Sequence, residues 1–131
     1  MEYPDKKERS FKRFLKSFKF AYDGLKYAFT YEQNIIVHVL IALFVVFFGL
    51  LLNISTTEWL ICFIVIGLVI ATELVNTSIE AVVDLVTDEK KALAKIAKDT
   101  ASAAVFVFAL VAVCVGAIIF IPKIVVFLGV M

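Results

Sequence analysis

The chain has 131 residues, 63% of them hydrophobic, and a mean hydropathy of +1.00, which lies far above the norm for soluble domains. Its length indicates one domain, 1–131, and its composition excludes an ordinary soluble protein in favour of a membrane protein. The formal net charge of +1 gives no indication of a nucleic-acid partner, and Cys62 and Cys114, which lie in apolar runs, are expected to form neither a disulfide nor a metal site.

Positive charges are strongly segregated along the chain. Of the 13 lysines and arginines, eight lie between Lys6 and Lys26, four lie between Lys90 and Lys98, and the remaining one is Lys123. Because the cytoplasmic segments of membrane proteins carry an excess of lysine and arginine, this distribution is a topology signal.

The charge distribution predicts the orientation of the chain. The segments 1–34 and 85–99 are expected on the cytoplasmic side, whereas the loop 53–58, which has no lysine or arginine, is expected outside. The N-terminus is therefore expected to be cytoplasmic, and three membrane crossings would leave the C-terminus outside.

The first predicted element is a surface helix at 11–31. Apolar residues recur at intervals of three and four from Phe11 to Phe29, while basic residues such as Arg13 occupy the other faces. This pattern is typical of an amphipathic helix that lies in the membrane interface, with its aromatic face toward the acyl chains and its basic residues toward anionic headgroups.

Three transmembrane spans are predicted at 35–52, 59–75 and 101–121. His38 lies about one turn inside the first span, and we expect it to form a hydrogen bond at headgroup level or between helices. Trp59, at the start of the second span, is typical of the aromatic belt at a membrane interface.

Further signals mark the ends of the helices that contain the second and third spans, which are called here the second and third membrane helices. Ser55 or Thr56 is expected to cap the second helix, which is predicted to continue beyond the bilayer to Val86. A polar break follows, in which Asp88 is the expected cap of the third helix, and Pro122 is expected to end that helix.

A polar stripe follows the second span. One helical face carries polar residues at offsets of 0, 3, 7 and 11: Glu73, Asn76, Glu80 and Asp84. Hydrocarbon does not solvate an unpaired carboxylate, so Glu73, which follows an almost unbroken apolar run, is a functional candidate. Glu80 and Asp84 have a second interpretation as residues that solvate the helix end, and the role of Asp84 stays open.

The predicted orientation brings six polar residues to the cytoplasmic membrane surface: Glu32, Glu73, Asn76, Glu80, Lys98 and Asp99. Acids, an amide and a lysine at one surface are able to bind a divalent cation, neutralise phosphates and take a proton from a hydroxyl, as phosphoryl transfer requires. The same set suits an ion-coupled transporter, since buried carboxylates carry that function too. The chain has no glycine-rich phosphate-binding motif, so a kinase of this kind must hold its nucleotide with side chains.

The polar stripe also carries a family resemblance. The stretch 73–84 reads E-L-V-N-T-S-I-E-A-V-V-D, and 97–104 reads A-K-D-T-A-S-A-A. The first stretch is similar to the signature E-x-x-N-[ST]-[SA]-I-E-x-x-V-D of the bacterial integral-membrane diacylglycerol kinase family, and the resemblance covers essentially the whole chain. The stretches 83–88 and 120–123 resemble the Gram-positive branch, whose members phosphorylate undecaprenol.

This resemblance implies roles for the acids and the amide. It implies that Glu73 is the general base that draws the proton from the lipid hydroxyl, and that Asn76 orients Glu73 or the substrate. It also implies that Glu32 and Glu80 hold Mg²⁺, which bridges the phosphates of ATP.

The resemblance further implies a nucleotide site and an assembly. Lys98 is expected to meet phosphate, and Asp99 to position that lysine or to contact the nucleotide. Arg13 lies where the family also has a basic residue near the active site, within reach of substrate or nucleotide. The family forms homotrimers with sites between subunits, and three spans of one chain cannot enclose a polar stripe alone.

The expected protein is therefore an all-α membrane protein with three transmembrane helices and an N-terminal amphipathic interfacial helix, assembled as a homotrimer. Its expected activity is ATP- and Mg²⁺-dependent phosphorylation of undecaprenol at the cytoplasmic face of the bacterial cell membrane. Diacylglycerol, which would give phosphatidic acid, is the alternative substrate. A small ion-coupled transporter subunit is the alternative of another class, although the sequence shows neither an internal repeat nor a broken span, which transporters often have.

Overall fold

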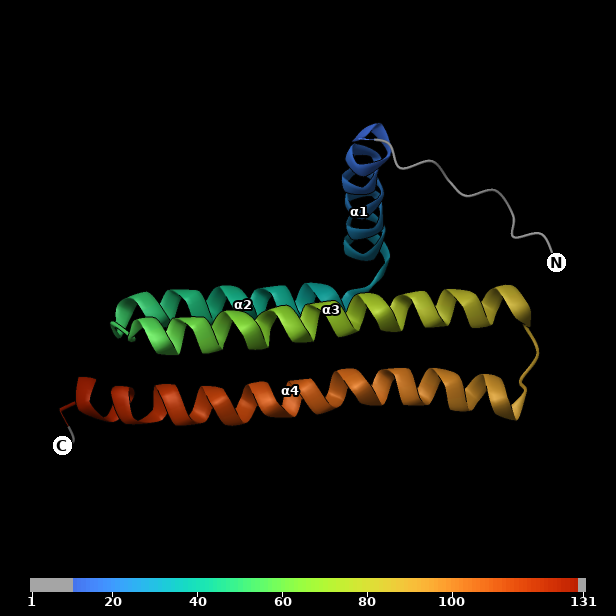
Figure 1. The fold of residues 1–131 in the computed structure, drawn as a ribbon. Coiled ribbons are helices and arrows are strands. Elements are labelled where there is room, and N and C mark those ends of the chain that lie inside the picture. The colour runs from blue at the N-terminus through green and yellow to red at the C-terminus, as the bar shows by residue number, and fades with distance from the viewer. Residues whose placement is uncertain (1–10, 130–131) are drawn as a thin grey trace.

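The computed structural model describes residues 11–129, which form four helices: α1 (Phe11–Tyr31), α2 (Gln33–Leu51), α3 (Thr56–Val86) and α4 (Ala92–Phe127) (Figure 1). The described part of the chain contains no strand, so the prediction of an all-helical protein is confirmed. The parts of the predicted domain at 1–10 and 130–131 lie outside the described residues.

Three of the helices, α2, α3 and α4, are long and apolar enough to cross a membrane. They run side by side along their lengths, whereas α1 stands across them (Figure 1). A helix that lies in the membrane plane would have this direction relative to helices that cross the membrane. The polar end of α3 continues well beyond the start of α2, to Val86, as predicted.

Helix α3 is the centre of the packing. It contacts α2 on one side and α4 on the other, and α1 packs on both α2 and α3. The polar stripe is part of α3, and its first two residues, Glu73 and Asn76, are buried. This arrangement places residues from distant parts of the sequence around one segment of α3.

A tight turn joins α2 to α3. Asn53 has a φ of 51°, a left-handed conformation that asparagine tolerates better than most residues. Ser55 caps α3, because its hydroxyl accepts a hydrogen bond from the Glu58 N–H at 3.3 Å and its own N–H donates to the Glu58 carboxylate at 2.6 Å. This reciprocal capping confirms the predicted role of Ser55.

The turn is held by close packing at this end of the spans. Ile54, Cys62 and Ile119 form a buried apolar cluster that joins the turn, α3 and α4. Gly49 lies against the ring of Trp59, and a Cβ atom at position 49 would come within 2.6 Å of that ring. Small residues permit such close approach between membrane helices.

The prediction that Pro122 ends the last helix is wrong. Helix α4 continues past this residue to Phe127. A proline removes one backbone hydrogen bond, but membrane helices tolerate this loss where neighbouring contacts hold the helix. The ammonium group of Lys123 lies 3.2 Å from the carboxylate of Glu58 on α3. This ion pair fastens the last turns of α4 to the start of α3.

Asp88 does not cap α4, so that prediction is also wrong. The N-cap residue is Lys91, which makes no side-chain capping bond. In the preceding loop, the Thr87 hydroxyl accepts a hydrogen bond from the Glu89 N–H at 3.1 Å, and the Lys91 N–H donates to the Glu89 carbonyl at 2.8 Å. This turn delays the start of the helix and leaves Asp88 too early in the chain to reach its first N–H groups.

The long helices expose most of their apolar surface within one chain. Only 11% of the most apolar window of α2 is buried, and the same fraction is buried in α4. Apolar surface of this extent requires a cover of lipid or of other protein.

Candidate active site

Glu32 forms the corner between α1 and α2. It is the single residue between the two helices, with an extended backbone (φ −103°, ψ 108°), and its N–H donates to the carbonyl of Ala28 at 2.9 Å. Ala28 is almost fully buried, where α1 meets the other helices. The corner leaves the Glu32 side chain half-buried beside the polar stripe of α3.

Helix α1 meets α3 near the polar stripe. A shallow hollow between the two helices is lined by Ala21 and Gly24 from α1 and by Thr77 and Ala81 from α3. Helices α1 and α3 therefore meet at the level of the polar stripe. This contact fixes the depth of Glu32, which follows directly after α1.

Glu73 is a buried acid on α3, with 6% of its side chain exposed. Its Oε1 atom lies 3.2 Å from Nε2 of His38 on α2, and the His38 ring is 19% exposed. This contact places His38 between two helices, which is one of the two positions expected for it. Sequence reasoning did not pair the two residues, although both lie about one turn inside the same predicted membrane surface.

Asn76 is the second buried polar residue of the stripe, at 7% exposure. Its Nδ2 group donates to Oε1 of Glu80 at 3.1 Å, whereas its Oδ1 atom has no hydrogen-bond partner within residues 11–129. An unsatisfied buried oxygen costs roughly 1–3 kcal/mol, so this atom is suited to accept a hydrogen bond from a bound molecule.

Exposure increases along the polar stripe. Glu73 and Asn76 are buried, Glu80 is half-buried and Asp84 is exposed. The carboxylates of Glu32 and Glu80 lie near enough to Glu73 for their charges to act on it. The structure thus brings together four of the six residues assigned to the predicted cytoplasmic surface.

Lys98 and Asp99 lie further from the buried acid, on the part of α4 that precedes its apolar run. The ammonium group of Lys98 donates to Oδ1 of Asp84 at 2.6 Å, and Asp99 forms an ion pair with Lys95. The hydrogen bond to Asp84 raises the pKa of Lys98, and the charges of Asp84 and Glu80 act in the same direction. Lys98 is therefore a cation beside the exposed end of the stripe, at Asp84.

Arg13 is not brought to the site by its own chain. It lies exposed near the end of α1 that is remote from α2 and α3 (Figure 1). With a rise of about 1.5 Å per residue, the helix carries it roughly 25 Å or more from the corner at Glu32. Its predicted role stays a prediction, and a neighbouring chain would have to supply it.

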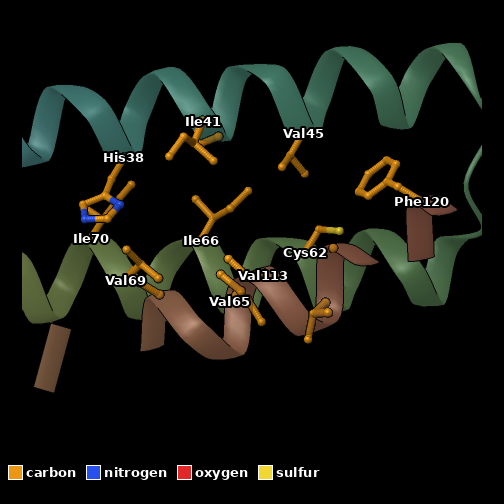
Figure 2. A pocket seen from close by; sticks show the side chains of 15 residues that line it. His38, Ile41, Val45, Cys62, Val65, Ile66, Val69, Ile70, Val113 and Phe120 are labelled. Carbon is orange, nitrogen blue, oxygen red and sulfur yellow. The ribbon is translucent and has the colours of Figure 1, made fainter. Parts of the chain in front are cut away.

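An apolar cavity of about 290 Å³ opens beside the His38 and Glu73 pair, between α2, α3 and α4. Figure 2 shows His38 at one end of this cavity and Phe120 at the other. The wall between these ends is formed by aliphatic side chains such as Val45, Ile66 and Val113, together with the thiol of Cys62. The cavity suits a hydrocarbon chain whose polar end lies at His38.

The oxygen atoms around Glu80 suit a hard cation. No group of three or more His, Cys, Asp or Glu side chains in the described chain is arranged as a complete metal site. Mg²⁺, however, is commonly bound by one or two carboxylates together with substrate phosphates and water. Glu32 and Glu80 supply two such carboxylates, so the residues present fit Mg²⁺ that arrives with a nucleotide.

Phosphoryl transfer to a membrane alcohol requires a base at the membrane surface, charges that neutralise phosphates, and an apolar place for the lipid. The described fold has a buried acid, further charged side chains and an apolar cavity within one bundle, which is compatible with an integral-membrane lipid kinase. The chain belongs to the prokaryotic diacylglycerol kinase family, because the model of that family matches residues 19–120.

Individual relatives agree with this assignment. The chain is 44% identical over 111 residues to "Undecaprenol kinase" of Bacillus subtilis, covering 85% of this chain and 90% of the relative. It is 37% identical over 109 residues to "Diacylglycerol kinase" of Synechocystis sp., covering 82% of this chain and 62% of the relative. It is 39% identical to "Diacylglycerol kinase" of Helicobacter pylori, covering 75% and 77% of the two chains. The chain is therefore a lipid kinase, and the transporter alternative is set aside.

Proposed function

We propose that the chain transfers the γ-phosphoryl group of ATP to the hydroxyl of undecaprenol at the cytoplasmic face of the bacterial cell membrane. The observation that carries this proposal is the buried Glu73 carboxylate, which contacts His38 at one end of the apolar cavity. The similarity to the undecaprenol kinase of Bacillus subtilis, at 44% identity, supports the choice of lipid.

Glu73 acts as the general base. The lipid hydroxyl gives its proton to the Glu73 carboxylate while its oxygen attacks the γ-phosphorus atom. The bond from this phosphorus to the bridging oxygen of ADP breaks, and ADP leaves with the electron pair. Asn76 is placed to orient the acceptor, because its free Oδ1 accepts a hydrogen bond beside the base.

Charged groups around the polar end of α3 hold the nucleotide. Lys98 meets the phosphates, and Asp99 on the same helix positions that lysine or contacts the nucleotide. Glu32 and Glu80 would hold Mg²⁺, which neutralises phosphate charge when bound. Because Glu80 also accepts the hydrogen bond of Asn76, the metal-binding acid and the acceptor-binding amide are fixed to each other.

The lipid tail lies in the apolar cavity. The tail passes between α2, α3 and α4, so that its terminal hydroxyl reaches Glu73 beside His38. Polyprenol and diacylglycerol both present a primary hydroxyl at the interface, and the shape of the tail distinguishes them.

A homotrimer completes the site. The large exposed apolar surface of α2 and α4 supports assembly, and a neighbouring chain supplies Arg13, which its own chain holds away from the stripe. Helix α1 lies on the cytoplasmic membrane surface, with its aromatic residues toward the lipid.

The test uses purified full-length chain in detergent micelles with labelled ATP, Mg²⁺, and either undecaprenol or diacylglycerol. We expect labelled undecaprenyl phosphate at a rate at least about tenfold above that of phosphatidic acid, a margin of about 1.4 kcal/mol. Equal rates, or a preference for diacylglycerol, would refute the choice of lipid. The absence of label in both lipids would refute the proposed site chemistry.

A further inference from the structure

The pairing of His38 with Glu73 has no role in the chemistry described above. His38 is the single histidine of the chain, and it lies on α2, whereas Glu73 lies on α3. Its Nε2 is 3.2 Å from Oε1 of Glu73, and both side chains are largely buried. A polar ring inside an apolar span is costly unless its hydrogen bond is used.

We propose that His38 is a positioning residue, which holds the Glu73 carboxylate in the orientation that receives the proton of the lipid hydroxyl. This inference rests on the proposed function, because it assigns a second residue to the same base. His38 acts through Glu73, and no bond to the substrate is required of it.

The geometry divides the two carboxylate oxygens between two tasks. Nε2 of His38 lies against Oε1 at 3.2 Å, and the lipid hydroxyl would meet the other oxygen, Oε2. A glutamate side chain has several rotatable bonds, and one fixed oxygen removes much of that freedom. A catalytic base that is in turn oriented by a third group is a recurring arrangement in enzymes, and a displacement of about 1 Å can lower the rate by about a hundredfold.

His38 also fixes the base relative to the lipid. Its ring lines the end of the apolar cavity, so the same side chain contacts the space for the tail and the base (Figure 2). A hydroxyl at the end of a bound chain therefore meets a carboxylate whose direction is already set. The contact joins α2 to α3, so the relative position of the two spans decides the orientation of Glu73.

Four variants separate positioning from packing. His38→Leu removes the donor but keeps an apolar side chain that fits the cavity wall. His38→Gln keeps an N–H donor at nearly the same reach. Ile35→Val, about one turn earlier on α2 and buried outside the cavity wall, is the matched packing control. His38→Leu combined with Glu73→Gln tests whether the effect passes through Glu73.

The measurement is kcat and the KM for ATP with undecaprenol in micelles. We expect His38→Leu to lower kcat at least about tenfold with the KM for ATP within about twofold, and His38→Gln to restore kcat to within about threefold of the wild type. Ile35→Val should keep kcat within about twofold, and His38→Leu should have no further effect when Glu73 is already glutamine.

Three results would overturn the inference: an unchanged kcat in His38→Leu, a loss in His38→Gln as large as in His38→Leu, or an undiminished effect of His38→Leu beside Glu73→Gln. Binding of a non-hydrolysable ATP analogue reports whether each variant is folded. If His38→Leu does not fold, His38→Gln decides alone, since a loss of more than about tenfold in kcat contradicts positioning by a donor. A wild type without lipid phosphorylation refutes the proposed function, whereas an active wild type with an insensitive His38 refutes only the positioning role.

Discussion

Lys98 on α4 donates a hydrogen bond to Asp84 on α3 over 2.6 Å, across the loop that joins the two helices. This contact gives Asp84 a partner, although its role was left open by the sequence. It also holds the ammonium group of Lys98 beside the exposed end of the polar stripe, where Glu80 adds a second negative charge. Asp84 therefore fixes the cation that is proposed to meet the phosphates of the nucleotide.

The substitution Asp84→Asn should weaken nucleotide binding moderately. It removes the charge of the pair but keeps an oxygen acceptor, and exposed ion pairs contribute little, so we expect the KM for ATP to rise about two- to fivefold with kcat unchanged. Lys98→Met should raise the same KM at least about tenfold, because it removes the phosphate contact itself. Steady-state kinetics at varied ATP measure both values.

Glu89→Gln is the matched control for Asp84→Asn. Glu89 is an exposed acid of the same region, and its carboxylate pairs with Lys91 instead of Lys98. Its substitution should leave the KM for ATP unchanged. If Asp84→Asn also leaves this KM unchanged, Asp84 does not hold Lys98 for the nucleotide.

The substitution Glu73→Gln should abolish most of the turnover. Glutamine keeps the size of the side chain but cannot accept the proton, so kcat should fall at least about a hundredfold. An ATP analogue should still bind, because Glu73 is assigned to the lipid hydroxyl. Glu58→Gln, which changes an acid at the other end of α3, should keep its turnover. Near wild-type turnover in Glu73→Gln would exclude Glu73 as the base, and Asp99 would be the next acid to test.

The substitution Glu80→Gln should abolish Mg²⁺-dependent turnover without unfolding the chain. Mg²⁺ prefers charged carboxylate oxygens, and the amide keeps only a weak oxygen ligand and the hydrogen bond from Asn76. A titration of activity against Mg²⁺ concentration measures the change, and circular dichroism checks the helix content. A variant with the wild-type rate and midpoint would remove Glu80 from the metal site.

The substitution Ala112→Phe should impair binding of the lipid and spare that of the nucleotide. Ala112 lines the apolar cavity, and a phenyl ring there would occupy the proposed place of the tail. We expect the KM for undecaprenol to rise at least about fivefold with the KM for ATP unchanged. Ala104→Phe, at an exposed position of the same helix, is the control. Equal effects of the two substitutions would place the tail elsewhere.

Labelling of introduced cysteines tests the proposed orientation. In a background with Cys62→Ala and Cys114→Ala, Thr56→Cys should react with an impermeant thiol reagent added outside intact cells. Thr87→Cys should react only after the cells are opened, because it lies at the polar end of α3 with the proposed site. The reverse pattern would place that end of α3 outside, away from cytoplasmic ATP.

The helices and one face of the site could be predicted from the pattern of residues alone. The repeat of apolar residues and the spacing of Glu73, Asn76 and Glu80 are local properties, and a regular helix converts them directly into a stripe. The capping role of Ser55 was also predictable, since it depends on residues within one turn. The lipid kinase assignment followed from the signature that the stripe carries.

Contacts between side chains of different helices could not be predicted in this way, because they depend on how the helices pack. Whether His38 reaches Glu73, and whether Lys98 reaches Asp84, depends on the depth and separation of two helices, which no local pattern encodes. Contacts between distant residues also explain why the prediction that Pro122 ends the helix was wrong. Proline weakens the helix locally, but α4 continues to Phe127. There, the contact between Lys123 and Glu58, residues far apart in sequence, helps to hold the last turns of α4 in place.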